Sequence, residues 1–211
     1  MKKLLLSAVF ALSICFAANA QDETTVTENP AEIKDGKTLT VDELKAQRAE
    51  LVAMLKSEDF QKALAKADAL KAPKEVGIGS VDALNGLVTT MLTQLRENRQ
   101  MIPQLYASVT GQTLDGAAAS EVKPISPDQL LGFSKMCIAM GGSLLKSSKD
   151  LITLPGDIKS AGIMKGIKAL KSLMYIKSSI SALKQEITYN SKMVNNLIAT
   201  NKLNMAAMAT K

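Results

Sequence analysis

The sequence contains no histidine and no tryptophan, and only three tyrosines and four phenylalanines among its 211 residues. Without histidine, the chain lacks the commonest general base near neutral pH and the commonest metal ligand of proteins. Nucleophile systems that pair cysteine or serine with histidine are therefore excluded. We expect neither an enzyme nor a bound metal or other cofactor.

Cysteine is equally scarce, with one residue at position 15 and one at position 137. Because Cys15 lies in a segment predicted to be removed, the mature chain cannot form an intrachain disulfide. Cys137 shares its predicted helix face with Phe133 and Met140. An apolar environment disfavours the thiolate, so we expect Cys137 to be buried and unreactive.

Motifs that bind phosphate, dinucleotides or calcium are also missing, and there is no C-x-x-C pair. Ser147, Ser148 and Lys149 are adjacent, but neighbouring residues on a helix diverge, which argues against serine–lysine catalysis. Acidic pairs such as Asp42 with Glu43 fall at predicted helix starts, where the helix dipole favours negative charge. These patterns indicate structure, not a catalytic site.

The first twenty residues, MKKLLLSAVFALSICFAANA, combine two lysines, an apolar run and a terminal Ala18-Asn19-Ala20. This pattern is typical of a signal peptide, and we predict cleavage after Ala20 and export to the periplasm or the cell exterior. Lipid attachment at Cys15 is disfavoured because Ile14 stands where a small residue is required. Residues 21–39 are predicted to be a flexible acidic segment, since they show no apolar period.

Residues 40–211 are predicted to form one helical bundle domain, because Leu, Ile, Ala and Met dominate the apolar composition. Capping signals at Thr40, Ser80, Ser126 and Asp157 mark helix starts. The predicted helices lie near 41–71, 81–109, 127–153 and 158–202, with a break possible at 57–59 and a turn at 155–156. We predict an all-α, antiparallel bundle of about four long helices with coiled-coil-like seams, in which the last helix is the longest.

Apolar residues follow one another at alternating steps of three and four, which is the spacing of packed helices. The predicted seam of the second helix is Val81, Leu84, Val88, Met91, Leu95, Asn98, Ile102, Leu105 and Val109. That of the third is Leu130, Phe133, Cys137, Met140, Leu144, Ser147, Leu151 and Leu154. In the last helix an early apolar face, Ile163, Ile167, Leu170 and Met174, is followed by Leu173, Ile176, Ile180, Leu183, Ile187, Asn190, Val194 and Leu197. Pro103 predicts a kink or a restart within the second helix.

A second row of apolar residues recurs every seven positions beside the third seam: Leu131, Ile138, Leu145 and Ile152. Ser134, Gly141 and Ser148 lie between the two rows. Glycine within a helix costs about 1 kcal/mol relative to alanine. Close approach of a neighbouring helix backbone would offset that cost, and we expect it here.

Two asparagines, Asn98 and Asn190, occupy seam positions that are otherwise apolar. Buried asparagine can fix the register or the number of packed helices. The alternative is an asparagine near a helix end or bend that water reaches.

Charge is distributed unevenly: the chain carries a net +6, or +4 without the first twenty residues and their two lysines. Residues 124–211 hold 12 lysines, no arginine and four acids. Since arginine's bidentate contacts with bases are missing there, nucleic acid is not an expected partner. Lysines at helical spacing usually form a solvated face. The alternative is a contact site for an anionic partner or lipid, and its candidates are Lys159, Lys165, Lys168, Lys171, Lys177 and Lys184.

For function, we expect an exported, non-catalytic interaction or assembly protein of a bacterial envelope or exterior, with a protein partner or self-association. The expectation rests on the missing site chemistry and on the surplus length of the last helix, whose residues 173–197 would form an exposed docking strip. The alternative is a membrane-active or lipid-binding bundle that uses the basic 127–187 hairpin. The least polar stretch, 130–145, is shorter than the roughly 20 residues of a spanning helix.

Overall fold

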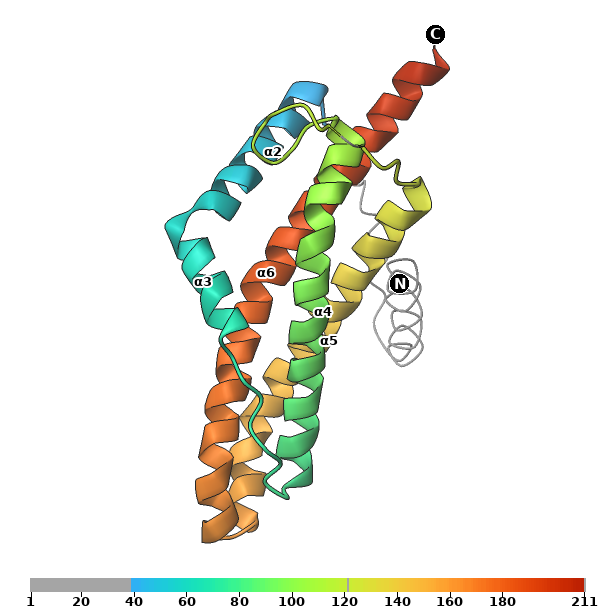
Figure 1. Cartoon of the computed structure of the whole chain (residues 1–211). Coiled ribbons are helices and arrows are strands. Elements are labelled where there is room, and N and C mark those ends of the chain that lie inside the picture. The colour runs from blue at the N-terminus through green and yellow to red at the C-terminus, as the bar shows by residue number, and fades with distance from the viewer. Residues whose placement is uncertain (1–38, 121, 211) are drawn as a thin grey trace.

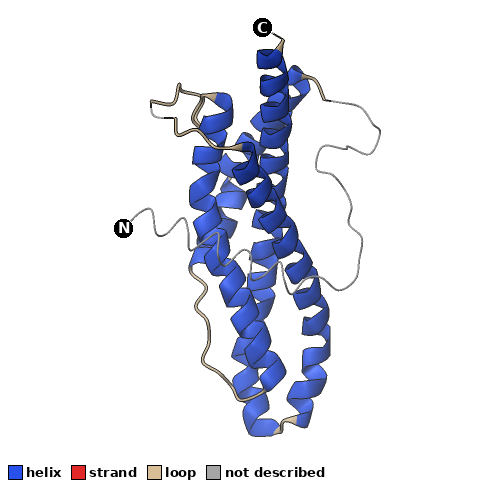
Figure 2. Ribbon diagram, turned by 90° about the vertical axis from the view of Figure 1, so that its right-hand side faces the viewer, coloured by secondary structure: helices blue, strands red, loops and turns tan. Residues whose placement is uncertain are grey.

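The computed structural model describes residues 39–120 and 122–210, which form an elongated bundle of helices (Figures 1 and 2). The helices are α2 (Val41–Lys56), α3 (Glu58–Asp68), α4 (Gly79–Thr110), α5 (Pro127–Ser160) and α6 (Ile163–Ala209). The described chain has no strand beyond an isolated bridge between Gln112 and Ala118. The predicted all-α bundle is confirmed, and α6 is its longest helix. The predicted signal peptide with Cys15 and the cleavage point, and residues 21–38, lie outside the described part.

The first predicted helix is two helices, because Ser57 interrupts it. Ser57 has extended dihedral angles, and its hydroxyl accepts a hydrogen bond from the backbone N–H of Phe60 at 3.3 Å. One side chain thereby starts α3 directly after the end of α2. The capping box at the start of α2 is confirmed, with Glu43 N donating to Thr40 Oγ1 and Thr40 N donating to Glu43 Oε2. α3 ends at Asp68, before the predicted boundary at 71.

The start of α4 differs from the predicted Ser80 cap. The N-cap residue is Ile78, and the carboxylate of Asp82 accepts the backbone N–H groups of Val76 at 2.8 Å and Gly77 at 2.9 Å. An acid within the first turn thus binds the incoming chain, and no hydroxyl is needed at Ser80. α4 continues without a restart through Pro103 and ends at Thr110, close to the predicted boundary at 109, with Gly111 at φ 69° as its C-cap.

The turn between α5 and α6 was placed too early in the sequence. α5 continues through Pro155 to Ser160, and α6 begins at Ile163, so the predicted turn at 155–156 and the cap at Asp157 are wrong. The chain reverses at Gly162, which has φ 88°, a conformation that residues with a Cβ rarely adopt. Within α5, Pro155 removes one backbone donor and crowds the carbonyl of Leu151, and the helix continues through it at an exposed position.

Two core clusters follow one another along the bundle, and they divide it into two halves. The open half contains the start of α4, the end of α5 and the start of α6, packed around Val81, Val88, Leu154, Ile176 and Leu183. The covered half contains the other ends of these helices together with α2 and α3, packed around Phe60, Leu105, Phe133, Met193 and Leu197. In Figure 1, α2 and α3 lie beside the upper part of α6, and the lower part consists of α4, α5, α6 and the linker that follows α3.

The predicted seams are buried in the structure. All nine seam residues of α4 are buried, as are those of α5 except the half-buried Leu151. The later seam of α6 is buried as well, apart from the half-buried Leu173 and Ile180. α6 contacts each of the other four described helices, and its last turns project beyond them (Figure 1). The expected docking strip at 173–197 is therefore wrong, because other helices of this chain already cover it.

Candidate functional site

Eight of the fourteen large apolar side chains that are exposed in the described chain lie in two rows on the α5–α6 hairpin, on residues that the sequence had placed on packed faces. In α5, Leu131, Ile138, Leu145 and Ile152 are 38%, 53%, 68% and 79% exposed. In α6, Ile163, Ile167, Leu170 and Met174 are 83%, 61%, 56% and 65% exposed. We call these eight residues the apolar strip. Exposure in the α5 row increases towards the turn at Gly162, so the strip is barest in the open half.

The two rows lie on the same side of the hairpin. With about 100° between successive residues of a helix, Ile138 lies about 160° from Met140, which accepts a hydrogen bond from Asn98 of α4. It lies only about 40° from Ser134, whose hydroxyl donates to Asn195 of α6. The α5 row therefore lies next to α6 and away from α4.

The same reasoning places the α6 row. A Cβ added to Gly166 would lie 3.6 Å from a side-chain carbon of Ile158, so this side of α6 faces α5. Leu170 lies about 40° from Gly166, but about 140° from Tyr175, whose hydroxyl hydrogen-bonds with Thr89 of α4 at 2.7 Å. Both rows thus border the α5–α6 contact on the side opposite α4.

The row of small residues between the seam and the strip does not pack as predicted. Within the described part of the chain, a Cβ added to Gly141 would meet no atom outside its own helix backbone within 4 Å, so no neighbouring described helix backbone approaches it. Ser134 is buried by α6, whereas Gly141 and Ser148 are half-buried. Gly141, where the sequence predicted close contact with a neighbouring helix, has no described helix packed against it on this side of the hairpin.

The six candidate lysines are all exposed, and none of them forms an ion pair with another residue of the described chain. Three of the six lysines border the strip. Lys171 follows Ile167 by four positions and so lies beside it on the surface of α6. Lys159 and Lys177 stand seven positions after Ile152 and Leu170, so each lies at the end of one row. Lys165 instead donates to the carbonyl of Gly77 at 3.1 Å. Lys168 follows the exposed Met164, and Lys184 lies beyond the end of the strip.

Two further lysines border the strip on α5, and sequence analysis had not singled them out. Lys135 and Lys149, both exposed, follow Leu131 and Leu145 by four positions. Two acids of α5 lie elsewhere, since Asp150 and Asp157 are about 160° and 140° from Ile152 around the helix. Asp128, in the first turn of α5, lies about 60° from Leu131 and so borders the far end of the strip. The strip is therefore apolar along its centre and basic along its edges.

Asn98 and Asn190 are both buried, each with 1% exposure. Asn98 Nδ2 donates to the sulfur of Met140 at 3.5 Å, but its carbonyl oxygen has no partner in the structure. The amide nitrogen of Asn190 also has no partner. Asn98 lies in the packed centre of the bundle, and Asn190 lines a cavity between α3, α4 and α6. Both are remote from the strip, and a role in fixing the register stays a prediction.

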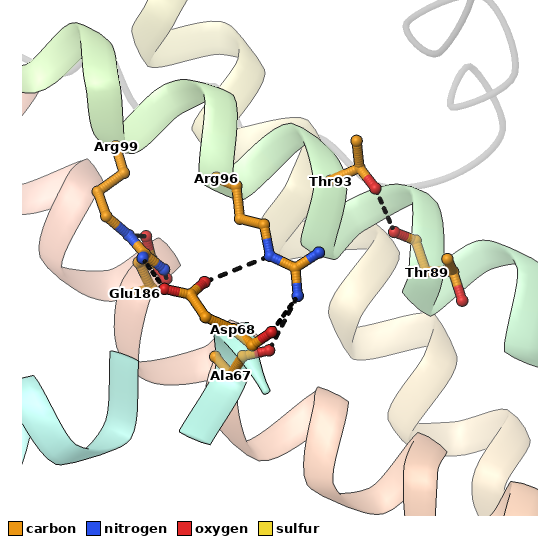
Figure 3. Close-up of polar contacts among 7 residues, drawn as sticks. All are labelled: Ala67, Asp68, Thr89, Thr93, Arg96, Arg99 and Glu186. Atoms are coloured by element: carbon orange, nitrogen blue, oxygen red, sulfur yellow. Dashed lines mark hydrogen bonds and ion pairs between the residues drawn. The ribbon is translucent and has the colours of Figure 1, made fainter. Parts of the chain in front are cut away.

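A polar clamp that the sequence analysis missed fastens α3 to α4 and α6 (Figure 3). Arg99 of α4 donates two hydrogen bonds of 2.8 Å to the carboxylate of Glu186 in α6 and one of 2.7 Å to Asp68 of α3. Arg96 binds the other oxygen of Asp68 at 3.3 Å and the carbonyl of Ala67 at 3.0 Å. The hydrogen bonds that Arg99 donates to Glu186 raise the pKa of Arg99 above its usual value. Since Glu186 is engaged here, its charge does not offset the lysines of the hairpin.

A second polar contact fastens α2. Arg48 is 7% exposed and donates to the side chains of Asn196, at 2.9 Å, and Thr200 in α6. Burial lowers its pKa. The burial of Arg48 could have been predicted from the sequence, because Arg48 stands four residues after Leu44 and three before Leu51, on the buried face of α2. The partners were not readable, since they lie some 150 residues away in the chain.

Cys137 is 2% exposed, as predicted, and burial raises the pKa of its thiol to about 12. Among the described residues, no group of three or more cysteine or acidic side chains is placed to hold a metal ion. A cavity of about 370 Å³ lies between α3, α4 and α6, beside the polar clamp. Within 39–120 and 122–210, no helix is both long and apolar enough to cross a membrane.

Comparison of the chain with protein-family models, with curated proteins and with solved structures finds no match.

Proposed function

We propose that this protein is an exported, non-catalytic interaction protein of the bacterial envelope or exterior, and that it binds its partner through the apolar strip. The observation that carries the proposal is the exposure of eight large apolar side chains along one side of one hairpin. Contiguous exposed apolar patches on soluble proteins mark interaction sites more often than chance positions do. The docking surface is thus on the opposite side of α6 from the one expected from sequence.

A photoreactive amino acid placed in the strip tests this proposal in intact cells. The probe replaces Leu145 or Ile167, and in the control it replaces Met208, which is at least as exposed but lies near the end of α6. We expect crosslinked adducts from positions 145 and 167, and none of the same mass from position 208. Strip positions that give no adduct, in a protein that light scattering shows to be a monomer, would contradict the proposal.

A membrane-active role is the second candidate, because exposed lysines adjoin the exposed apolar residues. Helices at membrane surfaces combine these two kinds of side chain and bind anionic lipid. Sedimentation with vesicles of phosphatidylcholine and phosphatidylglycerol, with and without 0.5 M NaCl, tests it. Salt-sensitive binding that is lost in Ile167→Ser and kept in Met208→Ser supports the lipid role, and absence of binding excludes it.

A further inference from the structure

We infer that the occupant of the apolar strip is an acidic amphipathic helix of another protein, which lies along the α5–α6 contact and adds a helix to the open half. This inference rests on the proposed function and names the partner of the same surface. Four properties of the strip support it: its spacing, its width, its charge and the small residues beside it.

The spacing of the strip is that of a helix–helix seam. The α5 row recurs at sevens, and the α6 row steps by four, three and four. The same threes and fours mark the buried seams of α4 and α5, which pack against helices in this structure. A repeat near 3.5 residues keeps a row of side chains facing a partner rod along its length. From Leu131 to Ile152 the row is about 30 Å long, enough for roughly three heptads of a partner.

The width of the α6 row distinguishes a helix from a lipid surface. Ile163, Ile167, Leu170 and Met174 fall within about 60° around the helix axis. Met164, which is also exposed, lies about 60° outside this arc, on the far side of Lys171. Lys171 and Lys177 lie close on either side of this row. A helix that lies in a membrane interface has a broad apolar face, whereas a narrow row is typical of a coiled-coil seam.

The charge at the edges of the strip argues against a second copy of this chain and for an acidic partner. Lys135 and Lys149 border the α5 row, and Lys171 and Lys177 border the α6 row. Two such hairpins packed face to face would bring the four lysines of each copy together with only Asp128, at the far end of the strip, to offset their charge among the described residues, which is unfavourable. Glutamates at the flanking positions of a partner helix would pair with these lysines.

The small residues allow a close approach. Gly141 and Ser148 lie beside the α5 row, and a Cβ added at Gly141 would have no atom of another described helix within 4 Å. Small residues on a helix let a second backbone come near. In this position they are unused within the chain, and a docked helix would use them.

Two synthetic 28-residue peptides test the inference against the purified exported protein. Both carry isoleucine and leucine at the seam positions of four heptads, one with glutamate and the other with lysine at the flanking positions. Fluorescence anisotropy should show at least tenfold tighter binding of the glutamate peptide at 50 mM NaCl, and weaker binding of it at 500 mM. The double variant Lys149→Glu with Lys171→Glu should reverse the preference, whereas Lys202→Glu, on an exposed lysine near the end of α6, should leave it unchanged.

Two methionines of α6, one inside and one outside the strip, test where on this helix the peptide binds. Met174 and Met208 are 65% and 75% exposed. Met174→Ser should weaken the binding of the glutamate peptide at least fivefold, and Met208→Ser should leave the binding affinity unchanged. Circular dichroism confirms that each variant is folded, since both side chains lie outside the core.

Three outcomes overturn the inference: equal or absent binding of the two peptides, binding to anionic vesicles in place of the peptide, or a dimer whose contact is lost in Met174→Ser. The proposed function is judged separately by the crosslinks from positions 145 and 167. If those crosslinks persist while the glutamate peptide fails to bind, the surface is a docking site and only the identity of its partner is wrong.

Discussion

The two halves of this bundle are built from the same three long helices, yet they bury α6 to very different extents. In the covered half, five of the six residues from 193 to 198 are buried, because α2 and α3 pack on a side of α6 that α4 and α5 leave free. In the open half, only Ala169 and Ser172 are buried between 163 and 174. Both stretches are rich in apolar residues. Apolar composition therefore does not decide burial here; the supply of partner helices does.

Thiol labelling should give the largest difference between the halves. Cys137 is buried in the covered half, and a pKa of about 12 against an ordinary 9.0 lowers its thiolate fraction roughly a thousandfold near pH 8. Leu145→Cys in a Cys137→Ala background places a thiol on the strip. We expect maleimide to label position 145 at least about a thousandfold faster than native Cys137. Comparable rates would show that the covered half opens readily.

The raised pKa of Cys137 also predicts a direction for stability against pH. Because the folded protein retains this proton above pH 9, where the unfolded chain loses it, the stabilising contribution is complete below pH 9 and disappears as pH rises towards 12. Burial raises the pKa of Tyr189 as well, and it acts in the same direction. Urea unfolding should therefore have a lower midpoint at pH 10.5 than at pH 8. Cys137→Ala should reduce this difference, and an unchanged difference would assign it to other groups.

Truncation of an apolar side chain should lower the free energy of unfolding by several kcal/mol more in the covered half than on the strip. Leu197 is fully buried, and Leu197→Ala should lower the free energy of unfolding by about 4 kcal/mol through lost burial and a cavity. Ile163 is 83% exposed, and Ile163→Ala should change the free energy of unfolding by less than about 0.5 kcal/mol. Chemical denaturation measures both. A large loss from Ile163→Ala would mean that the strip is packed within the chain after all.

Removal of the clamp tests what holds α3 on the covered half. Arg99→Ala leaves the buried carboxylate of Glu186, whose side chain is 3% exposed, without its partner, and should cost about 3 kcal/mol. Arg96→Ala should cost less, since its partner Asp68 is 46% exposed. Proteolysis of α3 should accelerate in Arg99→Ala. Equal losses from the two variants would contradict the central place of Glu186.

Gly141→Ala should give the smallest change, with opposite signs for folding and for binding. Alanine fits the helix, and no atom of another described helix lies within 4 Å of the added Cβ, so stability should rise by about 0.5 to 1 kcal/mol. The added methyl group should weaken a docked helix. Thermal unfolding and peptide anisotropy measure the two effects. If both the thermal stability and the affinity for the glutamate peptide increased, Gly141 would not contact the partner.

Much of the fold was predictable because helix packing is encoded locally. The spacing from Val81 to Val109 identified the buried face of α4, and Thr40, Ser57, Ser126 and Gly111 marked helix ends through contacts within a few residues. The turn at Gly162 was missed because Pro155 and Gly156 resemble a turn, and a helix can carry them where its neighbours leave it exposed.

The surface was harder to predict than the core. Periodicity shows that Leu131 and Ile163 lie on helix faces suited to packing, but it cannot show whether this chain supplies the opposite helix. The ion pairs of Asp68 with Arg99 and of Arg99 with Glu186 join residues far apart in sequence, so no local pattern announces them. The strip and the clamp both required the assembled structure.

The position of α6 has a consequence for biosynthesis. It is the last of the described helices to leave the ribosome, and it supplies side chains to both core clusters. Until it emerges, Arg48 and Phe60 have no Asn196 and Tyr189 to contact, and neither cluster can close. We therefore expect the bundle to complete its folding only after α6 has emerged, because both core clusters need its side chains.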